Sequence, residues 1–322
     1  MNIKEIIREI KGKQSEINSV IFVGCGASKA DLYPAKYFLD GNAKKLRVSH
    51  YTANEFNYAT PEAVNETAIV ITASLGGSTP ETVQANARAK ELGAHVISLT
   101  RSVDSALTKD ADYVIYHRFN ESYSAKLEKM GFALQLAMEI LEEVEGYDHY
   151  EEMKDGFNKI YGLADKAADS ARKYAKVFAE EYKDAPVIYV MSSGATHEVA
   201  YATSICLMME MQWINSGTFH SGEFFHGPFE IVEKDVPFIL LMNDGRTRSI
   251  DSRALTFLKR FDAKTTVIDA LDFGLSSEIS KSVIDYFNPM LLTAVFRVYA
   301  EELSYSRKHP LTKRRYMWKL EY

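Results

Sequence analysis

Carboxylate and imidazole side chains gather in one short segment of this chain, between residues 209 and 231. The segment contains Glu210, His220, Glu223 and His226, which stand among aromatic residues and glycines. These side chains are the ones most readily tuned for proton transfer near neutral pH. The segment is therefore a candidate for acid–base catalysis, for a metal site or for packing alone.

A metal site is the first alternative, because His220, Glu223 and His226 follow one another at intervals of three residues. On a helix, that spacing would bring two imidazoles and a carboxylate close together. However, Gly222 and the pair Gly227-Pro228 are poor helix residues, and the segment has no HExxH pattern. We therefore expect no metal ion at this position.

Two alternatives then remain for the segment. In the first, Glu210 ends a core-facing helix over residues 202–214, and the histidines pack beneath aromatic rings. In the second, Glu210 and His226 form a proton-transfer pair that acts on one substrate. The residue types and spacing leave both alternatives open.

The whole chain has the composition of an ordinary globular protein, with 46% hydrophobic and 25% charged residues among 322. This length suits two domains of roughly 150 residues each. A net charge of −6 argues against a nucleic-acid binder. Cys25 and Cys206 sit in apolar runs, which favours free thiols in a reducing cytoplasm. Because no run approaches the roughly 18 apolar residues of a membrane helix, we expect no membrane contact.

A duplication organises the chain. Short apolar runs in the first half recur 168 to 170 positions later, and Gly26 matches Gly194. The paired runs are 21–28 with 187–195, 68–77 with 236–245, and 95–100 with 265–270. Helical segments at 80–92 and 247–261 separate them, and Gly93 is a plausible end signal for the first. Each half is therefore expected to be a doubly wound α/β domain with a parallel sheet flanked by helices.

Helices are expected to join the two halves between residues 123 and 184, where apolar residues recur every three or four positions. Gly146-Tyr147-Asp148 interrupts that pattern. We place the domain boundary there, which gives a first domain over 1–146, a second over 147–306 and a tail over 307–322.

Two glycine turns follow predicted strands, where ligands bind in open parallel sheets. The first holds Gly26 and Ser28, and the second runs from Ser74 to Thr79 ahead of a helix that starts near Pro80. Exposed backbone N–H groups, hydroxyl groups and a helix amino terminus suit the second turn to a phosphate. A simple turn with a helix cap remains the alternative. Neither turn has a P-loop lysine, and GCGAS falls short of GxGxxG.

The motifs together resemble the sugar isomerase, or SIS, family: a glycine turn after the first strand, an S-x-x-G-x-T loop, and a GE-x-x-HGP segment over residues 222–228. The resemblance covers both halves and implies two tandem SIS subdomains. It implies a site in which Glu210 is the base and His226 opens the sugar ring from a neighbouring subunit, so that a homodimer shares its active sites. The residues implied to bind the sugar phosphate are Gly26, Ser28, Ser74, Gly77, Ser78 and Thr79.

Departures from the isomerase pattern point to one branch of this family. Leu207 stands where the family's synthase has a lysine, and Gly76 replaces a loop serine. The segment MEMQW…HSGEFFHGPFE and the ending HPLTKRRYMWKLEY are similar to the deglycase branch. That resemblance implies a hydrolase that converts 6-phosphofructose-aspartate and water to glucose 6-phosphate and the amino acid, without metal or other cofactor. Alternatives are a deglycase for fructoselysine or glucoselysine 6-phosphate, an aldose–ketose phosphosugar isomerase, and a non-catalytic sugar-phosphate sensor.

The tail is the only strongly basic run in this acidic chain. Arginine binds carboxylates through paired N–H groups, so the tail is a candidate for holding the amino-acid part of a substrate. We expect Arg315 to make that contact with the substrate. The resemblance implies that Lys319 lies near the position of a tail lysine that contacts sugar in the synthase of this family. A solvated surface or a dimer contact is the alternative.

Overall fold

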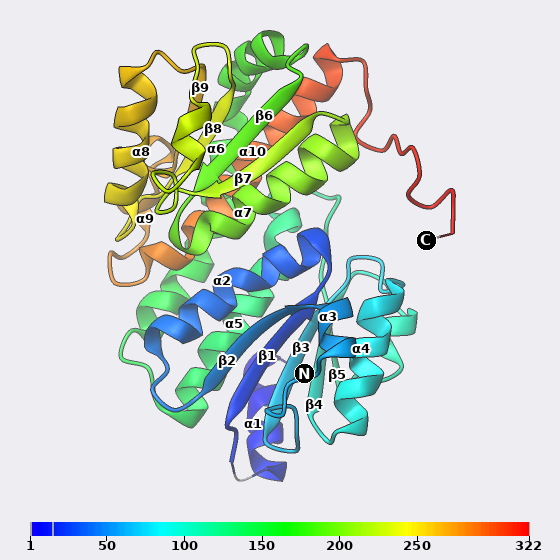
Figure 1. Ribbon diagram of the computed structural model, residues 1–322. Helices are drawn as coiled ribbons and strands as arrows, with labels where there is room; N and C mark the ends of the chain where they lie inside the picture. The colour runs from blue at the N-terminus through cyan, green and yellow to red at the C-terminus, as the bar shows by residue number, and fades with distance from the viewer. Residues whose placement is uncertain (1, 15, 322) are drawn as a thin grey trace. The chain divides into compact units, whose positions relative to one another are not determined.

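The protein is described here by a computed structural model that covers residues 2–14 and 16–321. It divides into two compact units, unit 1 (Met1–Asn158) and unit 2 (Lys159–Tyr322), and the division falls inside the long helix α6 (Tyr150–Tyr182). Each unit is built on a parallel sheet flanked by helices (Figure 1). The predicted α/β fold with two sheets is confirmed.

The sheet of unit 1 has five parallel strands in the order β2-β1-β3-β4-β5. The strands are β1 (Ser19–Gly24), β2 (Arg47–Thr52), β3 (Ala68–Ala73), β4 (His95–Thr100) and β5 (Tyr113–Tyr116). Every residue of β1 and β3 is buried, which explains why the sequence shows them as largely apolar runs, with Ser19 and Thr72 as the polar exceptions.

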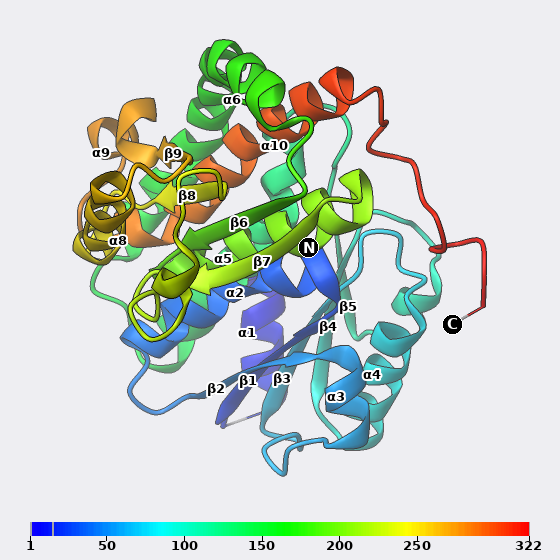
Figure 2. The same ribbon diagram turned by 45° about the horizontal axis from the view of Figure 1, so that its top comes forward.

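Helices cover both faces of this sheet (Figures 1 and 2). One face carries α1 (Ile3–Lys13), α2 (Gly26–Asn42) and α5 (Glu128–Val144), and the other carries α3 (Ala53–Tyr58) and α4 (Pro80–Glu91). Helix α4 begins at Pro80, as predicted, and Gly93 follows its end with a φ of +85°. Ile21, Val70 and Phe56 belong to the core between the sheet and this second layer.

The sheet of unit 2 has four parallel strands in the order β7-β6-β8-β9. They are β6 (Val187–Ser192), β7 (Asn215–His220), β8 (Phe238–Met242) and β9 (Thr265–Asp269). This order repeats that of β2-β1-β3-β4, and each matched run of the sequence contains all or most of the corresponding strand. The predicted duplication is therefore confirmed at the level of topology.

The second sheet is also covered on both faces. Helices α6, α7 (His197–Ala202) and α10 (Asn288–Ser306) form one layer, and α8 (Arg248–Arg260) lies on the other face. The short helix α9 (Leu275–Glu278) follows β9. Phe224, Phe238 and Leu258 are fully buried in the core beneath α8, so the loop after β7 contributes to this core.

The predicted connecting helices between residues 123 and 184 are α5 and α6, with Gly146 at a φ of +80° between them. The expected helix over 202–214 differs from the structure. Helix α7 continues as a π-helix, η4 (Thr203–Met211), and the helical path stops before Trp213, whose φ is +57°. Insertions of this type occur often at functional sites.

Strands β2, β5 and β7 are absent from the sequence-based prediction. All three lie at sheet edges, where one side of the strand is unpaired and the residues are less buried. Strand β7 reads Asn-Ser-Gly-Thr-Phe-His, a composition of low strand propensity. Pairing with β6 therefore determines this strand more than its own residues do.

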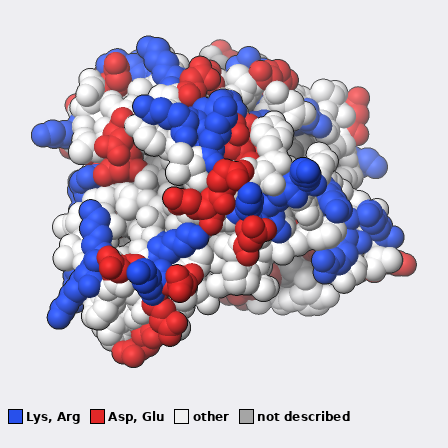
Figure 3. Space-filling view, turned by 90° about the horizontal axis from the view of Figure 1, so that it is seen from above, with Lys and Arg blue, Asp and Glu red and all other residues white. Residues whose placement is uncertain are grey.

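Cys25 and Cys206 are both free thiols. None of the helices in the described ranges is long and apolar enough to cross a membrane. On the face shown in Figure 3, basic and acidic side chains are interspersed, in keeping with the mixed charge of the chain.

Candidate active site

The loop after β3 has the geometry of an anion site. Gly77 has a φ of +64°, and a Cβ atom at this position would lie 2.0 Å from the hydroxyl oxygen of Ser105, so only glycine fits. The Ser74 and Thr79 hydroxyl oxygens lie 3.0 Å apart. Within residues 2–14 and 16–321, no hydrogen bond engages the backbone N–H groups of Gly76, Ser78 or Thr79. These donors, at the start of α4, suit a phosphate.

The turn after β1 lies beside that loop. Gly24 of β1 pairs with Ala73 of β3, so both turns leave the same edge of the sheet. Gly26 has a φ of +52°, and Ser28 lies in the first turn of α2. Helices α2 and α4 pack on opposite faces, which makes this the switch point of the sheet, where ligands bind in this fold. The structure therefore brings together the six phosphate-site residues predicted in unit 1.

Lys129 is a buried residue of this region that sequence analysis missed. Its Nζ atom lies 2.8 Å from the hydroxyl oxygen of Ser28 and 3.1 Å from a carboxylate oxygen of Asp31. Only 4% of its side chain is exposed. Burial raises the pKa of Asp31, and Lys129 opposes that shift. The sequence signal was the single basic residue of the helix over 128–144, next to the apolar stretch that begins at Met130.

The counterpart of the phosphate loop in unit 2 is closed by its own side chains. The backbone N–H of Asp244 donates to Asn288 Oδ1 at 2.7 Å, and that of Arg246 donates to Asp285 Oδ1 at 2.8 Å. The N–H of Asn243 donates to a buried Asp carboxylate, Asp251, at 3.1 Å. These three N–H groups already have acceptors, in contrast to those of Gly76, Ser78 and Thr79 in unit 1, so the unit 1 loop is the better candidate for an anion.

Glu210, the predicted base, lies near the end of the π-helix, and an arginine of the tail binds it. Arg314 Nη2 lies 2.6 Å from Glu210 Oε1, with 8% and 23% of the two side chains exposed. The sequence-based prediction named the neighbouring Arg315 as a substrate contact and gave no role to Arg314. Thus the carboxylate is reached both by solvent and by the tail.

Trp213 packs against the tail close to Glu210 in the sequence. Its ring packs edge-on against His309 at 4.5 Å, with Arg315 over it at 4.3 Å and Lys313 at 5.0 Å. A tryptophan with a φ of +57° is strained, and such strain persists where surrounding contacts enforce it. Lys319 Nζ donates to the backbone oxygen of Arg314 at 2.7 Å. Arg315 and Lys319 therefore lie in the tail as exposed residues that help to shape it.

His226 lies far from Glu210 within one chain. Glu210 precedes β7, whereas His226 follows it in the turn that leads to η5 (Pro228–Ile231). The six residues of β7 span about 17 Å, at roughly 3.3 Å per residue. Glu210 thus stands at the amino-terminal edge of the sheet and His226 at the carboxyl-terminal edge. One chain does not bring this predicted pair together.

The other two titratable residues of the segment have structural contacts. His220 ends β7, its Nδ1 atom accepts a hydrogen bond from the backbone N–H of Gly222 at 3.0 Å, and its ring lies 5.0 Å from that of His197. The backbone oxygen of Glu223 accepts from the N–H of His226. The segment 221–227 is a turn, and the described ranges contain no group of three His, Cys, Asp or Glu side chains that could hold a metal ion.

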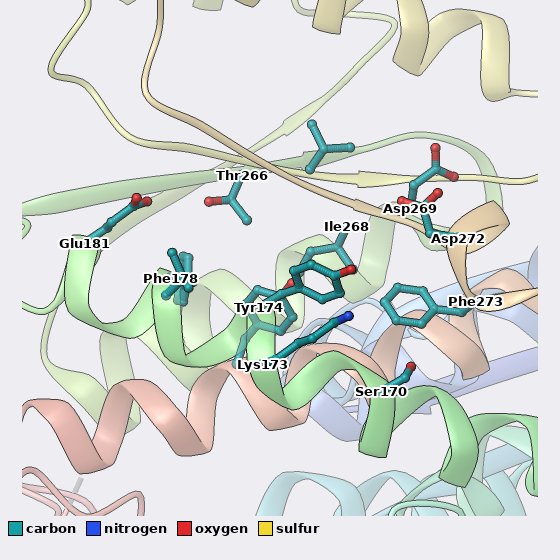
Figure 4. Close-up of a pocket in the computed structure, with 13 residues that line it drawn as sticks. Ser170, Lys173, Tyr174, Phe178, Glu181, Thr266, Ile268, Asp269, Asp272 and Phe273 are labelled. Carbon is teal, nitrogen blue, oxygen red and sulfur yellow. The ribbon is translucent and has the colours of Figure 1, made fainter.

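A separate cavity of about 650 Å³ lies between α6 and β9, and Tyr299 of α10 also lines it (Figure 4). Lys173, Tyr174 and Phe273 are among its lining residues, and none of the predicted site residues is. In unit 1, β5 pairs with β4, but β9 has no such outer neighbour among the described strands. The cavity is therefore explained by a strand that the second copy lacks.

Comparison with known proteins gives consistent matches. The model of the SIS domain family matches residues 15–138. The chain is 40% identical to the fructosamine deglycase FrlB of Bacillus subtilis (strain 168) over 320 residues, 99% of this chain and 97% of that protein. It is 25% identical to the fructoselysine 6-phosphate deglycase of Escherichia coli (strain K12) over 301 residues, 94% of this chain and 86% of that protein.

A solved structure extends these matches to the whole fold. A candidate phosphosugar isomerase from Salmonella typhimurium LT2 superposes with a TM-score of 0.96 and 45% identity, covering 100% of this chain and 96% of that one. The similarity therefore includes both units and the tail.

Proposed function

Because the chain belongs to the SIS family and is a homologue of fructosamine deglycases over nearly its full length, we propose that it is a deglycase for 6-phosphorylated Amadori compounds. The reaction converts the sugar–amino acid conjugate and water to glucose 6-phosphate and the free amino acid. The observation that carries the proposal is that the chain has both an anion-binding loop, in unit 1, and a solvent-accessible carboxylate, Glu210, in unit 2.

Unit 1 binds the phosphate in this proposal. The N–H groups of Gly76, Ser78 and Thr79, the hydroxyl groups of the loop and the amino terminus of α4 all favour an anion there. Ser28, with Lys129 behind it, adds a further donor from the neighbouring turn. Binding energy from this remote phosphate positions the reacting end of the sugar.

Glu210 is the proposed base. The substrate has a ketone at C2 and an amine at C1, and Glu210 removes a proton from C1. A proton delivered to the C2 oxygen gives an enaminol, and a second proton transfer, to C2, gives an aldimine at C1. Water adds to that aldimine, and the C1–N bond breaks to release the amine and the aldehyde of glucose 6-phosphate. Protons are redistributed, no electrons leave the system, and no metal or redox cofactor is needed.

His226 is the proposed group for opening the sugar ring, and we assign it to the partner chain of a homodimer. The assignment is supported by the length of β7, which keeps His226 and Glu210 of one chain at opposite sheet edges. Arg315 and Lys319 remain proposed substrate contacts, because both are exposed cations in the tail that covers the Glu210 segment. Two free cysteines agree with an assignment to the cytoplasm.

Aspartate is the proposed amino acid of the substrate, on the basis of the tail sequence. The test is a panel of 6-phosphofructosyl conjugates of aspartate, asparagine and lysine, with glucose 6-phosphate detected through its dehydrogenase. We expect signal with the aspartate conjugate. Signal with the lysine conjugate alone would reassign the amino acid.

Fructose 6-phosphate in the same assay tests the alternative of an aldose–ketose isomerase, because that activity would also yield glucose 6-phosphate. Turnover of fructose 6-phosphate alone would replace the deglycase proposal by the isomerase one. Absence of turnover with every compound would contradict both.

A further inference from the structure

Arg314 is almost fully buried, and its guanidinium is fixed by two hydrogen-bonded backbone oxygens and by an ion pair with Glu210. Nη1 donates to the backbone oxygens of Leu311 and Lys313 at 2.8 and 2.9 Å, and Nη2 lies 2.6 Å from Glu210 Oε1. The ring of Trp318 lies 5.2 Å from the guanidinium carbon. The cation is therefore held in one orientation at the proposed base.

One edge of the guanidinium, formed by Nε and Nη2, has a partner for only one of its two nitrogen atoms. Nε and Nη2 present parallel N–H groups that match the two oxygens of a carboxylate. Nη2 is bound to Glu210, but the buried Nε atom has no hydrogen-bond partner within the described ranges. A buried charged donor without an acceptor is costly, and such groups in native proteins call for an explanation. A second carboxylate would satisfy both N–H groups at once.

The substrate of the proposed reaction brings such a carboxylate to this position. In the conjugate of an α-amino acid, the carboxyl carbon is three bonds from sugar C1, or about 3 to 4 Å away by standard bond lengths. Glu210 must approach C1 to remove its proton, and Arg314 touches Glu210. The α-carboxylate therefore arrives beside the half-used edge of Arg314.

We propose that Arg314 is passed from Glu210 to the α-carboxylate of the substrate, so that binding of the correct substrate releases the base. Before substrate binds, Glu210 is held by the tail arginine. When the α-carboxylate occupies Nε and Nη2, Glu210 loses that partner and is free to accept the C1 proton. A conjugate without an α-carboxylate leaves Glu210 bound to Arg314 and reacts slowly. This inference rests on the deglycase assignment.

The 6-phosphofructosyl conjugates of aspartate and of β-alanine test the proposal, because they differ only in the α-carboxylate. With the unchanged enzyme, we expect the aspartate conjugate to exceed the β-alanine conjugate in kcat/KM by about 10- to 100-fold, the range of a paired charged hydrogen bond. In Arg314→Gln that ratio should fall towards one. In addition, kcat for the β-alanine conjugate should rise, because Glu210 no longer has a competing arginine.

Lys308→Gln removes one positive charge from an exposed position of the same terminal segment and is the matched control, which should keep the unchanged ratio. Circular dichroism and the melting temperature establish that each variant is folded. A ratio unchanged by Arg314→Gln, or a β-alanine kcat that does not rise, would overturn the exchange and leave the deglycase assignment intact. Turnover of neither conjugate would also overturn the exchange, and the deglycase assignment would fail with it only if the asparagine and lysine conjugates gave no turnover either.

Discussion

The ammonium nitrogen of Lys129 lies 2.8 Å from the hydroxyl oxygen of Ser28. A lysine can only donate, so the Ser28 oxygen accepts this bond and its own proton remains available for another acceptor. Asp31 balances the buried charge at 3.1 Å. Lys129 therefore orients Ser28 as a donor towards the proposed phosphate site.

Lys129→Met should raise KM for the phosphosugar by about tenfold, with a smaller effect on kcat, because a positioned donor to an anion is lost. In a Ser28→Ala background, the same substitution should add little, since its effect passes through that hydroxyl. Steady-state kinetics of the two single variants and the double variant measure the coupling. Additive increases in KM would show that Lys129 does not act through Ser28.

Gly77→Ala should destabilise the protein and disrupt the phosphate loop. The new Cβ would lie 2.0 Å from Ser105 Oγ at a backbone φ of +64°, and a strained backbone costs on the order of 1–3 kcal/mol before the clash is counted. Gly76→Ala is the matched control, because its Cβ would meet only Ser78 Oγ, at 3.8 Å. Thermal unfolding of the two variants measures the difference. Equal melting temperatures would be inconsistent with the described loop.

Trp213 gives a test of the tail that separates packing from backbone strain. Trp213→Ala and Trp213→Gly both remove the ring that holds His309, Lys313 and Arg315, so both should speed trypsin cleavage at Lys313 and Arg315. Glycine accepts a φ of +57° and alanine does not, so the glycine variant should be about 1 kcal/mol more stable. Alanine is usually the more stabilising of the two residues, so this order of stability is the reverse of the usual one. A more stable alanine variant would rule out the left-handed conformation.

The stability of the protein should fall as pH decreases from about 6.5 to about 4. Burial lowers the pKa of both His50 and His117 to about 4, from 6.5 in an exposed imidazole. Between those values the unfolded chain binds protons that the folded protein does not, so unfolding is favoured by acid. For His117, which is 4% exposed, the loss is of the order of 3 kcal/mol at the acidic limit.

His117→Asn measures that contribution, because asparagine can keep a donor for the backbone oxygen of Arg118, which lies 2.8 Å from His117 Nδ1. Urea unfolding across this pH range should give a shallower decline for the variant than for the unchanged protein. Parallel declines would show that His117 does not titrate as a buried group.

Much of the fold follows from its buried strands. The run 238–242 is apolar along its whole length, and the run 68–73 has Thr72 as its one polar residue, so their burial between helix layers is visible in the sequence. Strand β7 is not visible in this way, because its Asn, Ser and Gly residues are positioned by pairing with β6. The π-helix that carries Glu210 is similarly invisible, since nothing in local propensity separates it from an α-helix.

The candidate site likewise has some features that are visible in the sequence and others that depend on tertiary packing. Hydroxyl and glycine residues between Ser74 and Thr79 stand together in sequence, so their shared role could be predicted. Lys129 reaches Ser28 across 101 positions, and Arg314 reaches Glu210 from the tail, so these contacts depend on tertiary packing. Spacing could not show that β7 separates Glu210 from His226, because that strand was not predicted.

Because β7 separates Glu210 from His226 within one chain, we predict a specific activity for a homodimer that mixes two variants. Glu210→Gln and His226→Ala should each be inactive. If each site takes Glu210 from one chain and His226 from the other, a reassociated equal mixture should recover about one quarter of full activity, because half of the dimers are mixed and each has one intact site. Activity that stays at the level of the single variants would place both groups within one chain.

The central claim is that Glu210 removes a proton from a phosphorylated Amadori substrate. The most direct measurement follows glucose 6-phosphate release from 6-phosphofructose-aspartate by the unchanged protein and by Glu210→Gln, with folding checked by circular dichroism. We expect release by the unchanged protein and a fall in kcat of about 10²- to 10⁴-fold in the variant, the usual contribution of a general base. Full turnover by Glu210→Gln would contradict the account.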